Sequence, residues 1–127
     1  MSGAPDPKSR TLARGERRYR RKVASPKQWQ AIIAAKRGPC RVCNLRDGGL
    51  RGPHEYHHLI ERDAPHFGDD VADNIVPLHQ VCHEAVTAGL ASARRKLGES
   101  LTDAEYAYVI GKLGEDGPAR LFRVGAR

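Results

Sequence analysis

The 127-residue chain has few of the side chains that fill a large hydrophobic core. It contains two Phe, one Trp and one Met, and its apolar runs are far shorter than the roughly 18 residues that a membrane span needs. A domain with so little apolar volume usually depends on a disulfide or a metal ion for stability. We therefore expect one small domain with no transmembrane segment, held together by such a cross-link.

Cysteine is also scarce, and its number argues against a disulfide framework. The three cysteines, Cys40, Cys43 and Cys82, cannot all pair within one chain. The N-terminal segment has no apolar run of the kind found in secretory signals. The expected location is therefore the cytoplasm, where thiols stay reduced and metal binding is the better use for them.

Positive charge is concentrated near the start of the chain. Residues 1–28 hold nine Lys or Arg against two acidic residues, which accounts for the whole net charge of +7. We expect a basic, disordered arm over residues 1–24 and a folded domain over residues 25–127. Such an arm is typical of phosphate contact, although a solvated leader that binds nothing has the same composition. The candidate DNA-binding side chains are Arg14, Arg17, Arg18, Arg20, Arg21 and Lys22.

Capping and periodicity signals divide the remaining residues into short elements. Capping boxes begin at Ser25 and Thr102, and a glycine ends each of the helices that they start. Apolar periodicity predicts one further helix between them. The expected elements are helices over residues 25–38, 80–97 and 102–114 and strands over residues 54–60 and 74–78. Together they predict a small α+β fold.

Two pairs of residues have the spacing of a structural zinc site. Two residues separate Cys40 from Cys43, and two residues separate His79 from Cys82. A Cys-x-x-Cys turn places two thiolates on one side of a zinc ion and leaves two positions for a second pair. A redox-active cysteine pair would need a thioredoxin-like βαβ context, which the sequence lacks. The four residues therefore predict a closed site with three thiolates and one imidazole.

Further histidines have the chemistry of a catalytic centre. His57 and His83 could hold a divalent ion that keeps open positions for water and phosphate oxygens. His58 suits a general base, because the pKa of imidazole lies near working pH. Neighbours on a strand point to opposite faces, so His57 and His58 can share a site only where the strand is short, twisted or bulged. His54 and His66 are expected to be ordinary histidines, although His54 is close enough to be a rival ligand.

The ordered set of these motifs resembles the HNH nucleases, particularly the small zinc-containing forms found in bacteriophage genomes. The likeness covers about residues 38–90. The resemblance implies a ββα-metal fold, in which a hairpin packs on the helix that carries His83. It also implies that Asn74 braces the loop and orients His58 by hydrogen bonding. Many members have Cys in place of His79, so His79 could instead reach the catalytic ion. The shared motifs are Cys40-x-x-Cys43, His57-His58-Leu59-Ile60, Gly68-Asp69-Asp70, the segment from Asn74 to Leu78, and Cys82-His83.

The residues and the resemblance together imply an endonuclease that hydrolyses DNA. The expected cofactors are a structural Zn²⁺ and a catalytic divalent ion, Mg²⁺ or another such as Mn²⁺, Ni²⁺ or Zn²⁺. The expected partner is DNA. Phage packaging proteins are a further candidate, with the host bacterial cytoplasm as the location if the chain is phage-encoded. The main alternatives are a non-catalytic, zinc-stabilised DNA-binding module and a zinc-stabilised protein-interaction domain. His58 and Asn74 favour the nuclease, since a zinc site needs neither.

Overall fold

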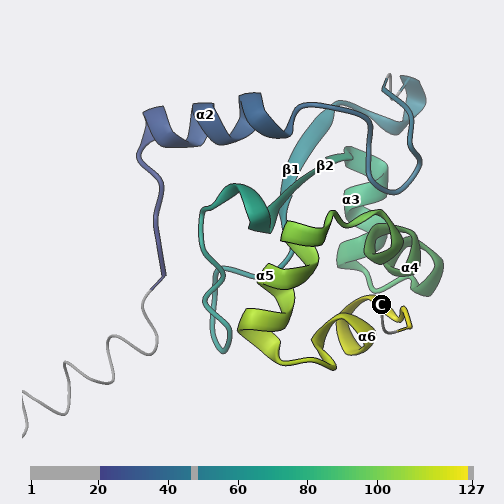
Figure 1. Ribbon diagram of the computed structural model, residues 1–127. Coiled ribbons are helices and arrows are strands. Elements are labelled where there is room, and N and C mark those ends of the chain that lie inside the picture. Colours follow the sequence, from purple (N-terminus) through teal and green to yellow (C-terminus); the bar gives the residue numbers. More distant parts are fainter. Residues whose placement is uncertain (1–20, 47–48, 126–127) are drawn as a thin grey trace, which may run out of the picture.

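The computed structural model describes residues 21–46 and 49–125. Within these residues, helices surround an antiparallel hairpin, and the predicted small α+β fold is confirmed (Figure 1). In this view the hairpin lies between α2 at the top and the group of α4, α5 and α6 below. The elements are α2 (Pro26–Lys36), the 3₁₀ turn η1 (Gly49–Arg51), β1 (His54–His58), the 3₁₀ turn η2 (Ala72–Asn74), β2 (Ile75–His79), α3 (Gln80–Thr87), α4 (Ala91–Ser100), α5 (Asp103–Leu113) and α6 (Gly117–Phe122).

The hairpin is a two-stranded antiparallel sheet. His54 lies opposite His79, and His58 lies opposite Ile75. Because successive side chains of a strand alternate, His54 and His58 share one face of β1 while His57 points to the other. β2 is buried along its whole length, whereas every residue of β1 is only partly buried. Within the described residues, no further strand pairs with the outer edge of β1.

The hydrophobic core lies between the hairpin and the C-terminal helices. Val76 and Leu78 of β2 belong to one buried cluster with Val86 of α3, Leu97 of α4 and Val109 of α5. The strand therefore anchors β1 and the start of α3 on a rigid base, which fixes the positions of the side chains that they carry.

The helix predicted as one element over residues 80–97 is wrong: the chain forms α3 and α4 with a break between them. Gly89, inside the predicted range, has a φ of 84°. This left-handed conformation is the usual stop signal of a helix and favours glycine. Leu90, which follows the apolar periodicity of the predicted helix, is 56% exposed. The stop signal at Gly89 therefore outweighs the apolar periodicity.

Both predicted capping boxes are confirmed. The hydroxyl of Ser25 accepts a hydrogen bond from Gln28 N at 3.2 Å, and Ser25 N donates one to Oε1 of Gln28 at 2.9 Å. Thr102 and Glu105 make the same reciprocal pair at the start of α5. The two strands overlap their predicted ranges, and α6 was not predicted.

Glu105 also has a second role that its capping position does not reveal. Its side chain is fully buried, and its two oxygens accept from the Arg41 guanidinium at 2.6 and 2.9 Å. Lys36 forms a further ion pair with the same carboxylate. One buried acid therefore ties α2, the Cys40–Cys43 loop and α5 together.

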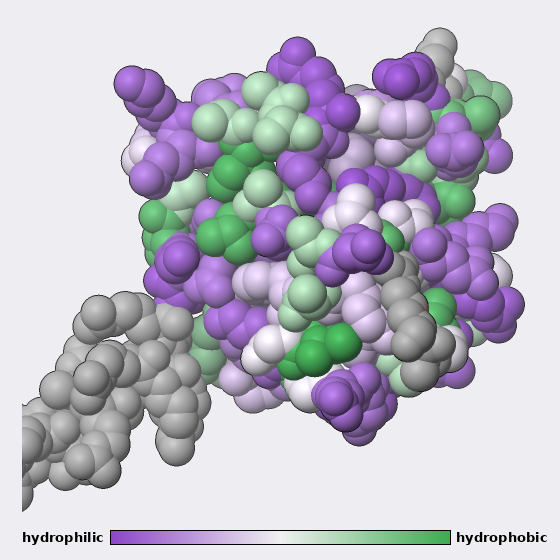
Figure 2. Space-filling model, viewed as in Figure 1, coloured by the Kyte–Doolittle hydropathy of each residue, from purple (hydrophilic) through white to green (hydrophobic). Residues whose placement is uncertain are grey.

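The surface of the domain is mainly polar on the face shown in Figure 2, where hydrophobic residues form small, separate patches. None of the described helices combines the length and the apolar character that a membrane crossing requires.

Candidate active site and metal-binding cluster

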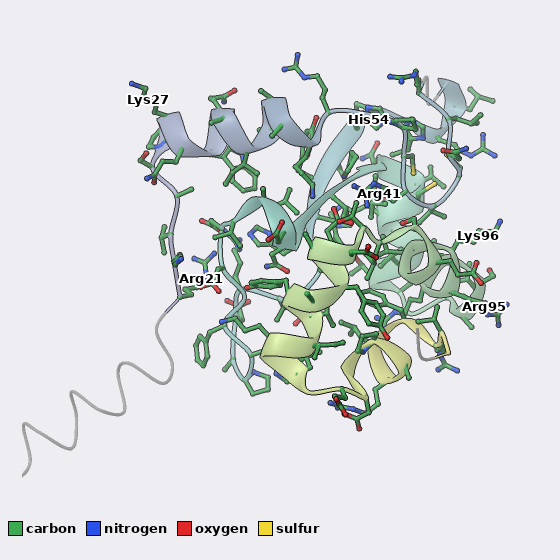
Figure 3. The ribbon with its side chains drawn as sticks, viewed as in Figure 1. Arg21, Lys27, Arg41, His54, Arg95 and Lys96 are labelled. Carbon is green, nitrogen blue, oxygen red and sulfur yellow. The ribbon has the colours of Figure 1, made fainter. Side chains whose placement is uncertain are left out.

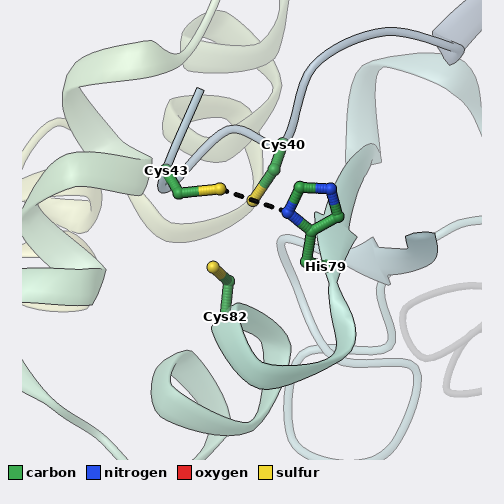
Figure 4. A group of neighbouring side chains, drawn as sticks. All are labelled: Cys40, Cys43, His79 and Cys82. Carbon is green, nitrogen blue, oxygen red and sulfur yellow. Dashed lines mark hydrogen bonds between the residues drawn. The ribbon is translucent and has the colours of Figure 1, made fainter. Parts of the chain in front are cut away.

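The predicted zinc ligands Cys40, Cys43, His79 and Cys82 lie together where the Cys40–Cys43 loop meets the turn from β2 to α3 (Figure 4). Their ligand atoms all lie within 4.8 Å of one another. Sγ of Cys43 is 3.2 Å from Nδ1 of His79. Three sulfur donors and one imidazole nitrogen are a set that zinc accepts. The cluster could hold zinc, and it fits a zinc-binding core.

The electrostatics of this cluster also suit a cation. Burial, together with the neighbouring thiols of Cys40 and Cys43, raises the pKa of Cys82 to about 12. Burial acts to raise the pKa of Cys40 as well, but backbone N–H groups that bond its sulfur outweigh burial and lower it. The fold thus stabilises one thiolate and opposes the ionisation of another nearby. A bound divalent cation would remove that opposition by neutralising the thiolates.

His79 lies with the cysteines and beside His54, and neither of these two histidines lines the space that His57, His58 and His83 share. Its ring stacks on that of His54, with centroids 4.4 Å apart and planes 7° apart. Burial and the nearby His79 lower the pKa of His54. This placement argues against both alternatives for the catalytic ion, His79 as its ligand and His54 as a rival ligand.

His57 and His83 face each other from β1 and α3. Nδ1 of His57 is 3.1 Å from Nε2 of His83, and Nδ1 of His83 is 2.8 Å from a carboxylate oxygen of Glu55. Burial, and then the charges of His83, His58 and Arg94, lower the pKa of His57 to about 3. The imidazole is therefore neutral, as a metal ligand must be. A carboxylate behind a histidine is also the usual support of a metal-binding imidazole.

His58 occupies a different environment on the other face of β1. Its Nε2 is 2.8 Å from Oδ1 of Asp70, and its ring stacks on Trp29 with centroids 5.8 Å apart. Burial lowers the pKa of His58, and the bond to Asp70 offsets only part of this effect. His58 is thus neutral at neutral pH. With Nε2–H donated to Asp70, its Nδ1 can accept a proton.

An open cleft of 610 Å³ brings the three histidines to one space. The lining includes His57 and His58 of β1, so side chains from both faces of that strand reach the cleft. The difficulty that His57 and His58 point to opposite faces is resolved because the strand is short and the cleft takes side chains from both of its faces. The cleft is lined by Ala24, Trp29, Tyr56, His57, His58, Glu61, Arg62, Asp63, Asp70, His83 and Thr87.

A comparison with protein families matches the same part of the chain. Residues 40–89, fewer than half of the 127, match the family model described as HNH endonuclease. The matched segment is similar to HNH endonucleases. No curated protein and no solved structure matches the chain. This match implies a nuclease-type function and a nucleic-acid substrate, and the matched HNH segment contains the cysteine cluster, the hairpin and α3.

Within the HNH segment, Asn74 braces the loop between the two strands. The side chain is fully buried. Its oxygen accepts from Ile60 N at 2.8 Å, and its amide donates to Ile60 O at 3.1 Å and to Asp69 O at 2.9 Å. The hydrogen-bond partner of His58 is not Asn74, as we expected, but the carboxylate of Asp70. Asn74 therefore acts on the backbone of the loop.

Glu55 and Asp70 are the site residues that the sequence did not reveal. Glu55 stands two residues before His57 and so shares a strand face with it, which was a readable signal. Asp70 lies in the Gly-Asp-Asp motif that we quoted for the resemblance. Its contact with His58 depends on the path of the loop between these two residues, which are twelve positions apart in the sequence.

Of the candidate DNA-binding residues, Arg21 and Lys22 are described, and Arg14, Arg17, Arg18 and Arg20 lie outside the described residues. Arg21 donates from Nε to Gly68 O at 2.7 Å and pairs with Asp70. Figure 3 shows Arg21 beside this loop. The end of the predicted arm, residues 21–24, is therefore attached to the folded domain and does not hang free of it.

Proposed function

We propose that the chain is an endonuclease that hydrolyses DNA phosphodiester bonds with one catalytic divalent ion. The HNH match supports a nuclease-type function. The observation that carries the finer proposal is the open cleft in which His57, His58 and His83 meet. The imidazoles of His57 and His83 contact each other, whereas His58 is bonded to Asp70. This arrangement suits two roles, metal binding by the pair and proton transfer by His58.

His57 and His83 would hold the catalytic ion through the two nitrogens that face each other. Glu55 fixes the tautomer of His83, because a carboxylate can only accept and so keeps the proton on Nδ1. Such an ion, when bound, stabilises negative charge on the phosphate and on the leaving oxygen. Cys40, Cys43, His79 and Cys82 would hold the structural zinc.

His58 serves as the general base. Its free Nδ1 takes a proton from the water molecule that attacks the phosphorus atom, and the bond from phosphorus to the 3′-oxygen breaks. The expected products are a 5′-phosphate and a 3′-hydroxyl. Residues 25–127 form the nuclease domain, and the Lys and Arg residues of the arm hold the DNA backbone without reading the base sequence.

A plasmid-nicking assay across a metal series tests the proposal. The full chain with Mg²⁺ or Mn²⁺ should relax or linearise supercoiled DNA, and His58→Ala should abolish cleavage while the thermal midpoint of unfolding stays close to that of the parent. His66→Ala is the matched control, because His66 is an exposed histidine of the neighbouring loop. Its activity should equal that of the parent.

Two results would contradict the proposal. Cleavage by His58→Ala at the parental rate would remove the general-base role. DNA binding without cleavage under every metal would favour the non-catalytic DNA-binding module.

A further inference from the structure

The first described residues are bonded to the loop that carries Asp69 and Asp70 (Figure 3). Asp70 N donates to Lys22 O at 2.8 Å. In return, Lys22 N donates to Oδ1 of Asp69 at 2.6 Å, and Ala24 N donates to Oδ2 of Asp70 at 3.0 Å. The last residues before α2 therefore run along this loop as a bonded segment.

The carboxylate of Asp70 joins this segment to His58. Oδ1 contacts both His58 Nε2 and the Arg21 guanidinium, and Oδ2 accepts from Ala24 N. The side chain is only 10% exposed. Burial acts to raise the pKa of Asp70, but the bonds from His58 and Ala24 and the charge of Arg21 outweigh it and lower the pKa. Asp70 is therefore an ionised acceptor.

The other side of the loop is fixed independently of the arm. Tyr108 of α5 donates to Oδ2 of Asp69 at 2.8 Å, and Lys112 pairs with the same oxygen at 3.1 Å. The ring of His58 is held from another direction by Trp29 of α2, with the two planes 12° apart. Arg21 and Ala24 are thus the groups that aim the Asp70 carboxylate, while α5 and Asn74 hold the backbone behind it.

We propose that Asp70 is a positioning residue for His58, and that residues 21–24 hold Asp70 in place, so that the base of the arm is part of the catalytic apparatus. This inference rests on the proposed nuclease function. An ionised carboxylate accepts and cannot donate, so it keeps the imidazole proton on Nε2 and leaves the lone pair on Nδ1. Arg21 then contributes to the rate of the chemical step in addition to any contact with DNA.

The first test reads the tautomer of His58 directly, with no need for cleavage. Nitrogen NMR of the zinc-bound full chain, at mildly alkaline pH where imidazole is neutral, should show His58 protonated on Nε2. The resonance is assigned by its loss in His58→Gln. In Asp70→Ala and in Arg21→Gln the same signal should shift towards a mixture of tautomers. An unchanged signal in both variants would overturn the proposal.

The second test separates rate from affinity. At saturating DNA, Arg21→Gln should cleave about 10- to 100-fold more slowly than the parent, the usual effect of losing a supporting group behind an active-site side chain. Asp70→Ala should be at least as slow. Lys96→Gln is the matched control: it removes the same charge from an exposed position on α4, on the opposite side of the molecule from Arg21 in Figure 3.

The outcomes distinguish this inference from the proposed function. If Arg21→Gln only raises the DNA concentration needed for half-maximal rate, Arg21 is a DNA contact alone and the inference is wrong. If the parent does not cleave under any metal, the nuclease proposal fails, and the NMR result alone still decides whether Asp70 and Arg21 set the tautomer of His58.

Discussion

The side chain of Asn74 satisfies three backbone groups of the β1–β2 loop without exposure to solvent. Asn74→Ala would leave Ile60 N–H and two carbonyls without these partners. Each buried group left unpaired costs about 1–3 kcal/mol, so we expect the free energy of unfolding to fall by about 2–4 kcal/mol. Urea denaturation measures this loss. Asp73→Ala, an exposed neighbour in η2, should unfold like the parent, and a fall of equal size there would contradict the role given to Asn74.

Glu55 makes a different kind of contribution, because its side chain is 40% exposed and its carboxylate contacts the ring of His83. Glu55→Gln should leave the stability of the fold nearly unchanged. It should raise the Mn²⁺ concentration needed for half-maximal nicking by about 10- to 100-fold. Glu84→Gln, an exposed position on α3, is the control. Equal metal dependence in the two variants would show that Glu55 does not support His83.

Single residues could be predicted from the sequence where their spacing is unusual. The cysteine pairs stood out because Cys-x-x-Cys has few other uses in a chain with reduced thiols. Asp70 did not, since acids are common on surfaces and only the tertiary fold places this one against His58. The hydrogen bond expected between Asn74 and His58 was wrong for the same reason. In the folded loop, the Asn74 side chain meets backbone groups of Ile60 and Asp69 and not the His58 ring.

Between elements, the carboxylate of Glu105 forms a buried polar link with Arg41 and Lys36. Glu105→Gln would leave Arg41 and Lys36 without their counter-charge. Breaking a buried pair in this way costs about 3–5 kcal/mol, and we expect a loss of this size at neutral pH by guanidinium denaturation. Glu99→Gln, an exposed position on α4, is the control and should unfold like the parent.

The same link gives a pH dependence with a definite sign. Burial acts to raise the pKa of Glu105, but the bonds from Arg41, Lys36 and Thr102 outweigh it, and the pKa lies below the ordinary value of 4.5. The carboxylate therefore contributes its full stability above about pH 4.5 and loses it as pH falls through the folded pKa. The difference in stability between parent and Glu105→Gln should be constant near neutrality and shrink in acid. A difference that grows below pH 4.5 would contradict this assignment.

At this scale the prediction succeeded where local chemistry decides the element. The capping boxes at Ser25 and Thr102 depend on residues three positions apart, and both helices begin where predicted. The break between α3 and α4 was missed because the apolar periodicity continues across Gly89, whereas the helical backbone conformation ends there. The bonds of Glu105 to α2 and to the cysteine loop cross more than sixty residues, and no local pattern reveals them.

For the whole molecule, the cluster of Cys40, Cys43, His79 and Cys82 joins the loop before β1 to the start of α3. Cys40→Ala should release the zinc that the parent retains and lower the thermal midpoint by about 10 °C or more, as expected for a loss of a few kcal/mol in a small domain. His57→Ala is the matched control and should retain its zinc. Tightly bound zinc in Cys40→Ala, measured by metal analysis after dialysis, would contradict the assigned ligands.

Two truncations separate the roles of the arm. Deleting residues 1–20 removes six Lys or Arg and keeps Arg21, so DNA affinity and its dependence on salt should both decrease. Deleting residues 1–24 should in addition slow cleavage at saturating DNA, because the contacts to Asp70 are lost. An unchanged salt slope after the shorter deletion would show that the arm does not contact phosphate.

The family motif itself covers only the segment that forms the cysteine cluster, hairpin and α3. The C-terminal helices complete the core and fix the Asp69–Asp70 loop through Tyr108 and Lys112. Their place in the site could not be predicted from the motif, because these contacts form only when α5 packs beside the loop.

The first turn of α3 serves both sites, since Cys82 faces the sulfur cluster and the next residue, His83, faces His57. An inserted or deleted residue there would rotate everything that follows by about 100°, and either ion would lose a donor. We therefore expect natural variants of this domain to differ in length in the connections from α2 to β1 and from β1 to β2, and to keep the number of residues from His79 to His83 constant. An alignment of such variants would show whether insertions and deletions are absent from the five positions 79–83.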